Sequence, residues 1–320
     1  MVTGSASGKV ILFGEHAVVY GRPAIAVPVA QLQATATVTP ASPGYGIALH
    51  LPDIGDHVPV TGLATERPLA QVIQHTVKAL ELSPTPDWTI TVHSDIPVAS
   101  GLGSGAAVAT AIVRAMAAAA DRKLSPDQVS AIVFEGEKLF HGTPSGIDNT
   151  VVAFEQPVWF IRTESAQPFP IAASLSIVIG DSGIASPTSV AVGDVRQAWQ
   201  NDQEFHDTIF DAISDIVHAA RTAMENGDMA TLGNLMDLNH RLLQRLKVSS
   251  PELNILCDAA RAAGALGAKL SGGGRGGNMI ALVQSGQEDS VVRALRKAGA
   301  VRTITTVVES VPEPVTRPSL

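Results

Sequence analysis

Short apolar runs alternate with turn residues over the first third of the chain, and this pattern predicts β-strands. These strands are expected at 10–13, 24–29, 33–38 and 88–93. Between them, the segment 41–57 is rich in Pro, Gly and Asp and predicts a loop or a hairpin. Helical periodicity covers 68–82 and ends at Ser83-Pro-Thr-Pro.

Two helices are predicted in succession before residue 141. The first, Ala106–Ala120, is a run of strong helix formers. The second begins at Ser125-Pro-Asp, which supplies an N-cap, a proline at the first helical position and an early acid, and it runs to about Phe140. The next apolar runs predict strands at 151–154, 158–162 and 175–179.

Helical patterns dominate the second half of the chain. Helices are predicted at 190–200, 205–226, 229–247, 251–264 and 290–298, and strands at 279–283 and 303–309. Short strands and helices interleaved in this irregular order predict an α+β protein. Because 320 residues are many for one core, we predict two domains, 1–170 and 171–320.

The composition excludes several classes of protein. A hydrophobic share of 45% with 16% charged residues is typical of a folded globular chain. The net charge of −8 argues against a nucleic acid or a membrane surface as partner. The single cysteine, Cys257, forms no intrachain disulfide, and no signal peptide or membrane-spanning run is visible. These observations together predict a cytoplasmic protein.

One glycine-rich segment, Pro97-Val-Ala-Ser-Gly-Leu-Gly-Ser-Gly-Ala-Ala107, leads directly into a predicted helix. Its glycines let a ligand approach the backbone, and the unpaired amides at a helix N-terminus favour an anion. The alternative is a tight turn before a buried helix. If the segment binds the phosphates of a nucleotide, the binding residues are Pro97, Ser100, Gly101, Leu102, Gly103, Ser104, Gly105 and Ala106.

Three further segments accompany this loop. They are Gly8-Lys-Val-Ile-Leu-Phe-Gly-Glu-His16, Phe140-His-Gly-Thr-Pro-Ser-Gly-Ile-Asp-Asn149 and Lys269-Leu-Ser-Gly-Gly-Gly-Arg-Gly-Gly-Asn278. In this order, the four segments resemble the GHMP kinase superfamily, and within it most closely the mevalonate kinases. The resemblance implies a ribosomal-protein-S5-like N-terminal domain, a ferredoxin-like C-terminal domain and an active site between them.

The resemblance also implies a chemistry: ATP-dependent, Mg²⁺-dependent phosphorylation of a small-molecule alcohol, mevalonate. Asp148 matches the carboxylate that approaches the substrate hydroxyl, and Lys9 beside it would keep that carboxylate ionised. Glu137 matches the magnesium-binding glutamate, with Ser104 as a second candidate ligand. Glu15, His16, Ser145 and Thr188 would bind the acceptor, and Gly273, Gly274 and Arg275 would complete the ATP site.

Each of these residues also has an ordinary structural interpretation. An aspartate after Pro-Ser-Gly is common in Asx turns, and a lysine at a strand end or a glutamate on a helix is usually solvated. A lone histidine at a strand end is more often a satisfied structural group. The kinase interpretation is favoured because all four segments occur in one chain and in one order.

The chain departs from the family at two loops. Mevalonate kinases usually read Gly-Leu-Gly-Ser-Ser-Ala-Ala, and here Gly105 stands where the second serine would help to bind Mg²⁺. A water molecule or Ser104 would have to take its place. Arg275 interrupts a loop that is normally made of small residues. Its guanidinium would either contact the β- or γ-phosphate of ATP or point to solvent.

Several functions stay open at this stage. The same fold supports kinases of related alcohols: mevalonate 3-kinase, phosphomevalonate kinase, homoserine kinase or a sugar kinase. A diphosphomevalonate decarboxylase is less favoured, because the Lys9 segment and the last glycine loop fit kinases better. The loss of the loop serine at Gly105 also allows a non-catalytic sensor of ATP and a metabolite. A homodimer is compatible with the family.

Overall fold

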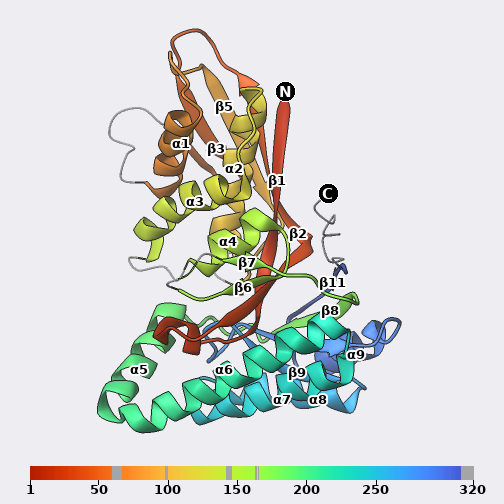
Figure 1. Ribbon diagram of the computed structural model, residues 1–320. Coiled ribbons are helices and arrows are strands. Elements are labelled where there is room, and N and C mark those ends of the chain that lie inside the picture. The colour runs from red at the N-terminus through yellow and green to blue at the C-terminus, as the bar shows by residue number, and fades with distance from the viewer. Residues whose placement is uncertain (60–66, 98–99, 142–145, 163, 165, 311–320) are drawn as a thin grey trace, which may run out of the picture. The chain divides into compact units, whose positions relative to one another are not determined.

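The structure is a computed structural model that describes residues 1–320 except 60–66, 98–99, 142–145, 163, 165 and 311–320 (Figure 1). The chain forms two compact units. Unit 1 comprises 1–9 and 28–155, and unit 2 comprises 10–27 and 156–320. The predicted domain boundary near residue 170 stays a prediction.

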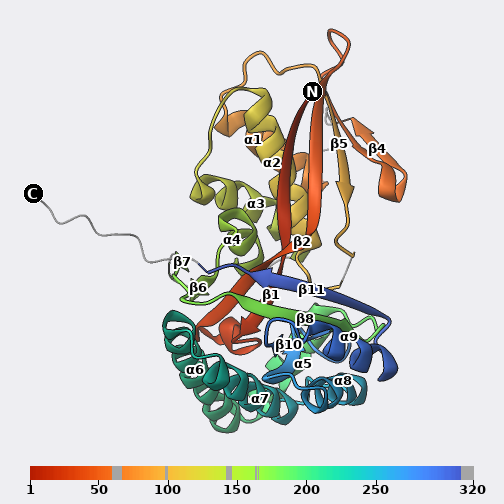
Figure 2. The same ribbon diagram turned by 90° about the vertical axis from the view of Figure 1, so that its right-hand side faces the viewer.

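Unit 1 contains a sheet with the strand order β4-β3-β5-β2, and β1 also pairs with β2 (Figure 2). Its strands are β3 (Ile47–Leu51), β4 (Asp56–Pro59) and β5 (Trp88–Ser94), with residues 2–9 of β1 (Val2–Phe13) and residues 28–40 of β2 (Ala24–Pro40). Strands β3 and β4 are antiparallel and are joined by a short 3-10 helix, Pro52–Ile54. The expected hairpin within 41–57 is therefore confirmed, although β4 extends beyond it.

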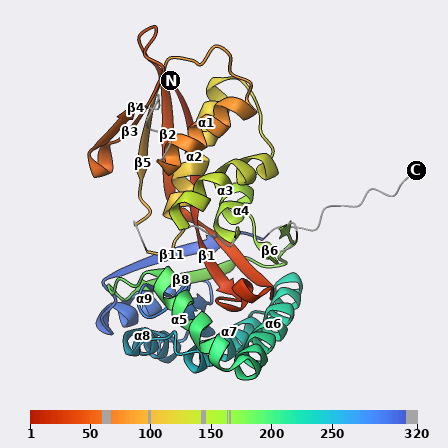
Figure 3. The ribbon, with the colours of Figure 1, turned by 90° about the vertical axis from the view of Figure 1, so that its left-hand side faces the viewer.

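Four helices cover one face of this sheet (Figure 3). They are α1 (Pro68–Ala79), α2 (Ser104–Ala119), α3 (Pro126–His141) and α4 (Ile147–Phe154). Small side chains let α2 approach closely: a methyl group added at Gly4 of β1 would overlap the backbone of Ala115. The alanine-rich helix is thus the buried centre of unit 1.

The strand predicted at 151–154 is wrong, because these residues form the second half of α4. Their Val-Val-Ala-Phe sequence suits a buried strand as well as a buried helix, and periodicity does not separate the two in so short a run. Gly146, with φ of 88°, supplies the left-handed residue from which the helix starts. Burial of Val151 and Val152 then stabilises the helix despite their β-branched side chains.

Unit 2 is built around a second antiparallel sheet with the order β11-β8-β10-β9. Its strands are β8 (Leu175–Asp181), β9 (Gly267–Ser271), β10 (Asn278–Val283) and β11 (Arg302–Val308). Unit 2 also contains two short strands, β6 (Val158–Phe160) and β7 (Gln167–Pro168). Strand β6 pairs with residues 24–26 of β2, which belong to unit 2, and β7 pairs with β6. The 3-10 helix Ala17–Tyr20 follows β1.

The helices of unit 2 agree with those predicted from the sequence. They are α5 (Thr188–Asn201), α6 (Gln203–Asn226), α7 (Met229–Arg245), α8 (Pro251–Ala262) and α9 (Glu288–Lys297). Helices α7, α8 and α9 pack on the sheet, and α6 packs on α7 (Figure 2). The predicted α+β class is confirmed. Within the described part of the chain, no helix is long and apolar enough to cross a bilayer.

Helix α7 lies unusually close to strand β9. A methyl group at Gly233 of α7 would overlap the carbonyl oxygen of Leu266, and one at Gly267 would overlap the carbonyl oxygen of Gly233. Only hydrogen atoms fit between the two backbones. These glycines therefore fix how closely the helix and the strand pack.

We expect Gly233→Ala to lower the free energy of unfolding by at least about 2 kcal/mol, because backbone atoms cannot move aside as a flexible side chain would. Gly193→Ala is the matched control, since Gly193 also lies in a helix and a methyl group there meets nothing within 4 Å. That variant should gain up to about 1 kcal/mol. Urea unfolding followed by circular dichroism measures both. Equal stability of the two variants would contradict the close approach.

Candidate functional site

The first glycine loop ends at Gly103, the left-handed N-cap of α2, with φ of 74°. Because a glycine has no side chain that could cap the helix, the first amides of α2 are available as donors for an anion. Leu102 accepts a 2.9 Å hydrogen bond from the amide of Lys9, which anchors the loop to β1. A Cβ at Gly101 would meet nothing within 4 Å, so the backbone there is open to a ligand.

Lys9 and Asp148 form an ion pair beside this loop. Lys9 Nζ lies 2.8 Å from Asp148 Oδ1, and the two side chains are 5% and 32% exposed. Asp148 is the second residue of α4, after the left-handed turn at Gly146. The carboxylate is thus oriented by a buried ammonium group and still accessible, as a proton acceptor for a bound hydroxyl must be.

Glu137 of α3 completes the charged group in unit 1. Its side chain is buried, and burial together with the negative charge of Asp148 raises its pKa to about 7, while Lys9 opposes the shift. A Cβ at Gly105 would lie 3.6 Å from Glu137 Oε1, so the missing loop serine would have stood next to this carboxylate. The neighbouring Glu135 instead pairs with Lys138 on the exposed side of α3.

These surroundings fit a divalent cation. A bound cation would stabilise the ionised form of Glu137, whose pKa is raised by burial and by the charge of Asp148, and Mg²⁺ is commonly held by one or two carboxylates plus substrate phosphates and water. No cluster of three His, Cys, Asp or Glu ligands occurs among the described residues. A magnesium site here would need the nucleotide for part of its coordination.

In unit 2, Glu15 lies in the turn after β1 and forms a buried ion pair with Lys269 of β9. The two side chains are 1% and 0% exposed. Lys269 Nζ also donates a 2.7 Å hydrogen bond to the carbonyl of Leu270, while burial lowers its pKa. The sequence marked Glu15 as an acceptor-binding residue but did not identify Lys269 as its partner. The sequence signal for this partner is that Lys269 is a positive charge within an otherwise apolar strand and so needs a negative partner.

His16 is held in the same turn with a left-handed φ of 61°. Its Nε2 lies 3.0 Å from the carbonyl oxygen of Gly273. Because a carbonyl only accepts, Nε2 carries the hydrogen and Nδ1 is an acceptor. Nδ1 is buried and has no hydrogen-bond partner among the described residues. Burial, assisted by the charges of Arg275 and Lys269, lowers the pKa of His16 to about 4, so the ring is neutral at neutral pH.

The last glycine loop is braced on both sides. A Cβ at Gly273 would approach Thr188 Cα to 3.1 Å, which places the loop against the first residue of α5. A Cβ at Gly274 would overlap the carbonyl of Val248. Arg275 forms an ion pair with Asp194 of α5, a partner that the sequence analysis did not foresee.

The remaining predicted residues are less informative. Ser104 Oγ donates a 3.4 Å hydrogen bond to the carbonyl of Ile96, and Ser100 Oγ donates a 2.8 Å bond to that of Pro97. Ala106 is buried in α2. Ser145 lies outside the described residues. In unit 1, Lys9, Asp148 and Glu137 thus lie close to one another and to the described part of the first glycine loop. The other predicted residues that the structure describes are in unit 2: Glu15, His16, Thr188, Gly273, Gly274 and Arg275.

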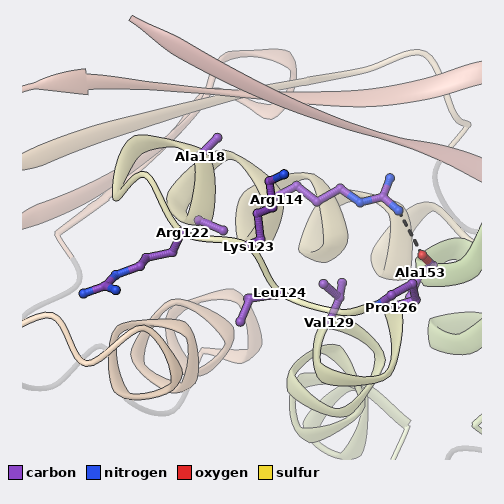
Figure 4. Close-up of a pocket in the computed structure, with 9 residues that line it drawn as sticks. Arg114, Ala118, Arg122, Lys123, Leu124, Pro126, Val129 and Ala153 are labelled. Atoms are coloured by element: carbon purple, nitrogen blue, oxygen red, sulfur yellow. Dashed lines mark hydrogen bonds between the residues drawn. The ribbon is translucent and has the colours of Figure 1, made fainter.

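A cavity of about 260 Å³ elsewhere in unit 1 is separate from these residues (Figure 4). It lies where α2 ends and α3 begins, and Arg114, which donates to the carbonyl of Ala153, forms part of its wall. Its lining contains no carboxylate, histidine or predicted site residue. It is therefore not the predicted kinase site.

Two buried histidines of unit 2 make stability dependent on pH. Burial, chiefly, lowers the pKa of both His16 and His240 to about 4. Nδ1 of His240 accepts a 3.2 Å hydrogen bond from the amide of Leu270, which requires the unprotonated nitrogen. The folded state therefore favours the neutral rings, whereas the unfolded chain binds protons near pH 6.5.

We expect the contribution of each histidine to the free energy of unfolding to be constant above about pH 7 and to fall as the pH drops from 6.5 towards 4, by roughly 2 kcal/mol at pH 5. Glu137, whose pKa is raised to about 7, contributes a slope of opposite sign over this range, so the histidine share is read from the difference between wild type and variant. Urea unfolding at several pH values measures this slope. His240→Gln should remove the contribution of one histidine, roughly 2 kcal/mol at pH 5, because glutamine does not titrate. A slope that is unchanged in this variant would contradict the buried neutral state of His240.

Comparison with known proteins agrees with the predicted family. The family models described as GHMP kinases N terminal domain and GHMP kinases C terminal match residues 69–156 and 220–301. The mevalonate kinase of Pyrococcus horikoshii is 34% identical over 324 residues, covering 96% of this chain and 95% of the relative. That of Aeropyrum pernix is 34% identical over 88% of this chain and 89% of its own.

Solved structures give the same result. The crystal structure of L. major mevalonate kinase in complex with R-mevalonate superposes with a TM-score of 0.82 at 30% identity, covering 97% of this chain and 96% of that one. Similarity of sequence and of fold thus extends over nearly the whole length, and the resemblance based on four short segments is confirmed. The chain belongs to the mevalonate kinases of the GHMP kinase family.

Proposed function

We propose that this protein transfers the γ-phosphoryl group of ATP to the primary hydroxyl of mevalonate, giving 5-phosphomevalonate and ADP. The observation that carries the proposal is the Lys9–Asp148 ion pair beside Glu137 and an open helix N-terminus. The relatives named mevalonate kinase, at 34% identity over most of their length, support the choice of acceptor.

Asp148 acts as the proton acceptor. As the hydroxyl oxygen of the acceptor attacks the γ-phosphorus, its proton passes to the Asp148 carboxylate and the bond between the γ-phosphorus and the ADP oxygen breaks. Lys9, 2.8 Å away, holds the carboxylate in one orientation and offsets negative charge as the phosphoryl group moves. The buried Lys9 side chain loses little freedom when substrates bind, because the loop at Gly103 already encloses it.

Backbone amides at the start of α2 bind the phosphates, with Gly101 and Gly103 leaving the backbone exposed. Glu137 holds Mg²⁺, with Ser104 as a second candidate ligand. When bound, Mg²⁺ neutralises charge on the triphosphate during transfer. Arg275 contributes its guanidinium to the β- or γ-phosphate, although one of its nitrogens already forms the ion pair with Asp194.

Residues of unit 2 select the acceptor. The unpartnered Nδ1 of neutral His16 accepts a hydrogen bond from an acceptor hydroxyl, which a protonated imidazole could not do. Glu15, fixed by Lys269, orients the same turn. Thr188 contributes a hydroxyl group near the transferred phosphate, a role that the family resemblance also implies for Ser145. Kinases of related alcohols use the same chemistry, so the acceptor is the finer part of this proposal. A cytoplasmic location and a homodimer stay predictions from the sequence.

A second candidate is a non-catalytic sensor of ATP and a metabolite. The observation in its favour is Gly105, which leaves the position next to Glu137 without a hydroxyl ligand. The sensor would bind ATP and the acceptor without turnover. Because the Lys9–Asp148 pair is retained, we favour the enzyme.

Asp148→Asn should lower kcat by at least about 10²-fold while ATP still binds, because the amide cannot accept the proton. The assay is ADP release with ATP, Mg²⁺ and, in turn, mevalonate, phosphomevalonate, homoserine and galactose. We expect turnover of mevalonate alone by the wild type. Turnover of another acceptor instead of mevalonate would overturn the assignment of mevalonate as the substrate. ATP binding without turnover of any of the four acceptors would favour the sensor.

Three variants test the metal site through the Mg²⁺ concentration that gives half-maximal activity. Glu137→Gln should raise it by about tenfold or more, because a neutral amide is a poor magnesium ligand. Glu135→Gln, on the exposed face of the same helix, should leave it unchanged. Gly105→Ser should lower it, since the new hydroxyl would stand beside Glu137. A shift equal in the Glu137 and Glu135 variants would argue against metal binding by Glu137.

A further inference from the structure

Helix α4, which carries Asp148, is tied to α3 by a chain of buried polar side chains. Asn149 Nδ2 lies 2.8 Å from Ser130 Oγ and 3.2 Å from the carbonyl oxygen of Ser130. Ser130 Oγ lies 3.3 Å from Thr150 Oγ1, and Thr150 Oγ1 lies 2.7 Å from the carbonyl oxygen of Gly146. Ser130, Asn149 and Thr150 are each at most 7% exposed, so water does not compete for these bonds.

The direction of every hydrogen bond in this chain is determined. The Asn149 amide nitrogen faces a carbonyl oxygen, so it is a donor to Ser130 Oγ as well. The carbonyl of Gly146 only accepts, which uses the one hydrogen of the Thr150 hydroxyl. Ser130 therefore donates to Thr150. The amide of Asn149, the two hydroxyls and the carbonyl of Gly146 form a single directed series, in which no hydroxyl can rotate without losing a bond.

The series ends at the carbonyl of Gly146, the residue from which α4 starts and which therefore helps to set the position of Asp148. Gly146 is the left-handed N-cap of α4, and Asp148 is the second helical residue after it. The series starts and ends on α4, and its middle member, Ser130, is on α3, whose later residue Glu137 is buried near Asp148. A rotation or shift of the α4 N-terminus relative to α3 would change the Lys9–Asp148 contact and the separation of the two carboxylates.

We propose that Ser130 and Thr150 are positioning residues for Asp148, which hold the first turn of α4 in register with α3. They touch neither nucleotide nor acceptor and affect the reaction only by fixing the position of the Asp148 carboxylate. The inference rests on the proposed function, because it assumes that Asp148 accepts a proton. It predicts that the hydroxyl groups at these positions matter for the rate of transfer more than for substrate binding.

Thr150→Val and Thr150→Ser form a matched pair of variants. Valine keeps the shape of threonine but removes the hydroxyl, whereas serine keeps the hydroxyl. Thr76→Val is the control, because Thr76 is also buried in a helix of unit 1 and donates an equivalent 2.7 Å bond to the carbonyl of Val72. All three are compared at a temperature well below the melting point of the least stable variant.

We expect Thr150→Val and Ser130→Ala to lower kcat by about 10- to 100-fold, with the KM values for ATP and acceptor within about twofold of wild type. Thr150→Ser should retain most of the activity, and Thr76→Val should match the wild type. An unchanged kcat in Thr150→Val, or an equal loss in Thr76→Val, would overturn the positioning role.

Hydrogen–deuterium exchange gives a readout that does not depend on turnover. Amides of 146–150 should exchange faster in Thr150→Val than in Thr150→Ser or Thr76→Val, because the N-terminal turn of α4 has lost one of its attachments to α3, the bond between Ser130 and Thr150. Equal exchange in the three variants would overturn the proposal. If the wild type turns over no acceptor, the proposed function fails on that result, while the exchange rates still decide whether Ser130 and Thr150 hold this turn.

Discussion

The ion pair between Lys9 and Asp148 is the constraint around which unit 1 is organised. A lysine buried to 5% exposure needs a partner, and the 2.8 Å contact with a half-exposed carboxylate provides one without burying both charges. The path of the lysine side chain explains the glycine at 103, where a Cβ would come within 2.8 Å of Lys9 Cγ. One electrostatic requirement therefore determines the conformation of the neighbouring loop and the start of α2.

The two units hold their charged residues and the adjoining loops in place by different interactions. In unit 1 the loop next to the charged residues is held by backbone contacts to β1 and by a side chain that passes beneath it. In unit 2 the corresponding turn is held by a fully buried ion pair, Glu15–Lys269, and by the imidazole of His16. A buried ion pair contributes little net stability but strongly penalises any structure in which its members are separated. It therefore favours one arrangement of the turn and the last glycine loop over others.

Much of this architecture was predictable, because the long helices α6 and α7 have clear periodicity and the four motifs identify the family. Interactions between distant segments were not. Nothing local marks Asp194 as the partner of Arg275, which lies 81 positions away, or Ser130 as the partner of Asn149. The segment 151–154 reads as a strand because it is an unbroken apolar run, buried at Val151, Val152 and Ala153, with no polar positions to reveal a helical period.

The buried thiol has a practical consequence. Cys257 is the single cysteine of the chain, and burial raises its pKa to about 12, so almost none of it is the reactive thiolate at neutral pH. Maleimide dyes and spin labels should therefore leave the native protein unmodified. A pair of engineered surface cysteines, one in each unit, would carry the probes without any removal of native residues. Distances between the labels could then be followed as ATP and acceptor are added, on a background in which the natural sequence is intact.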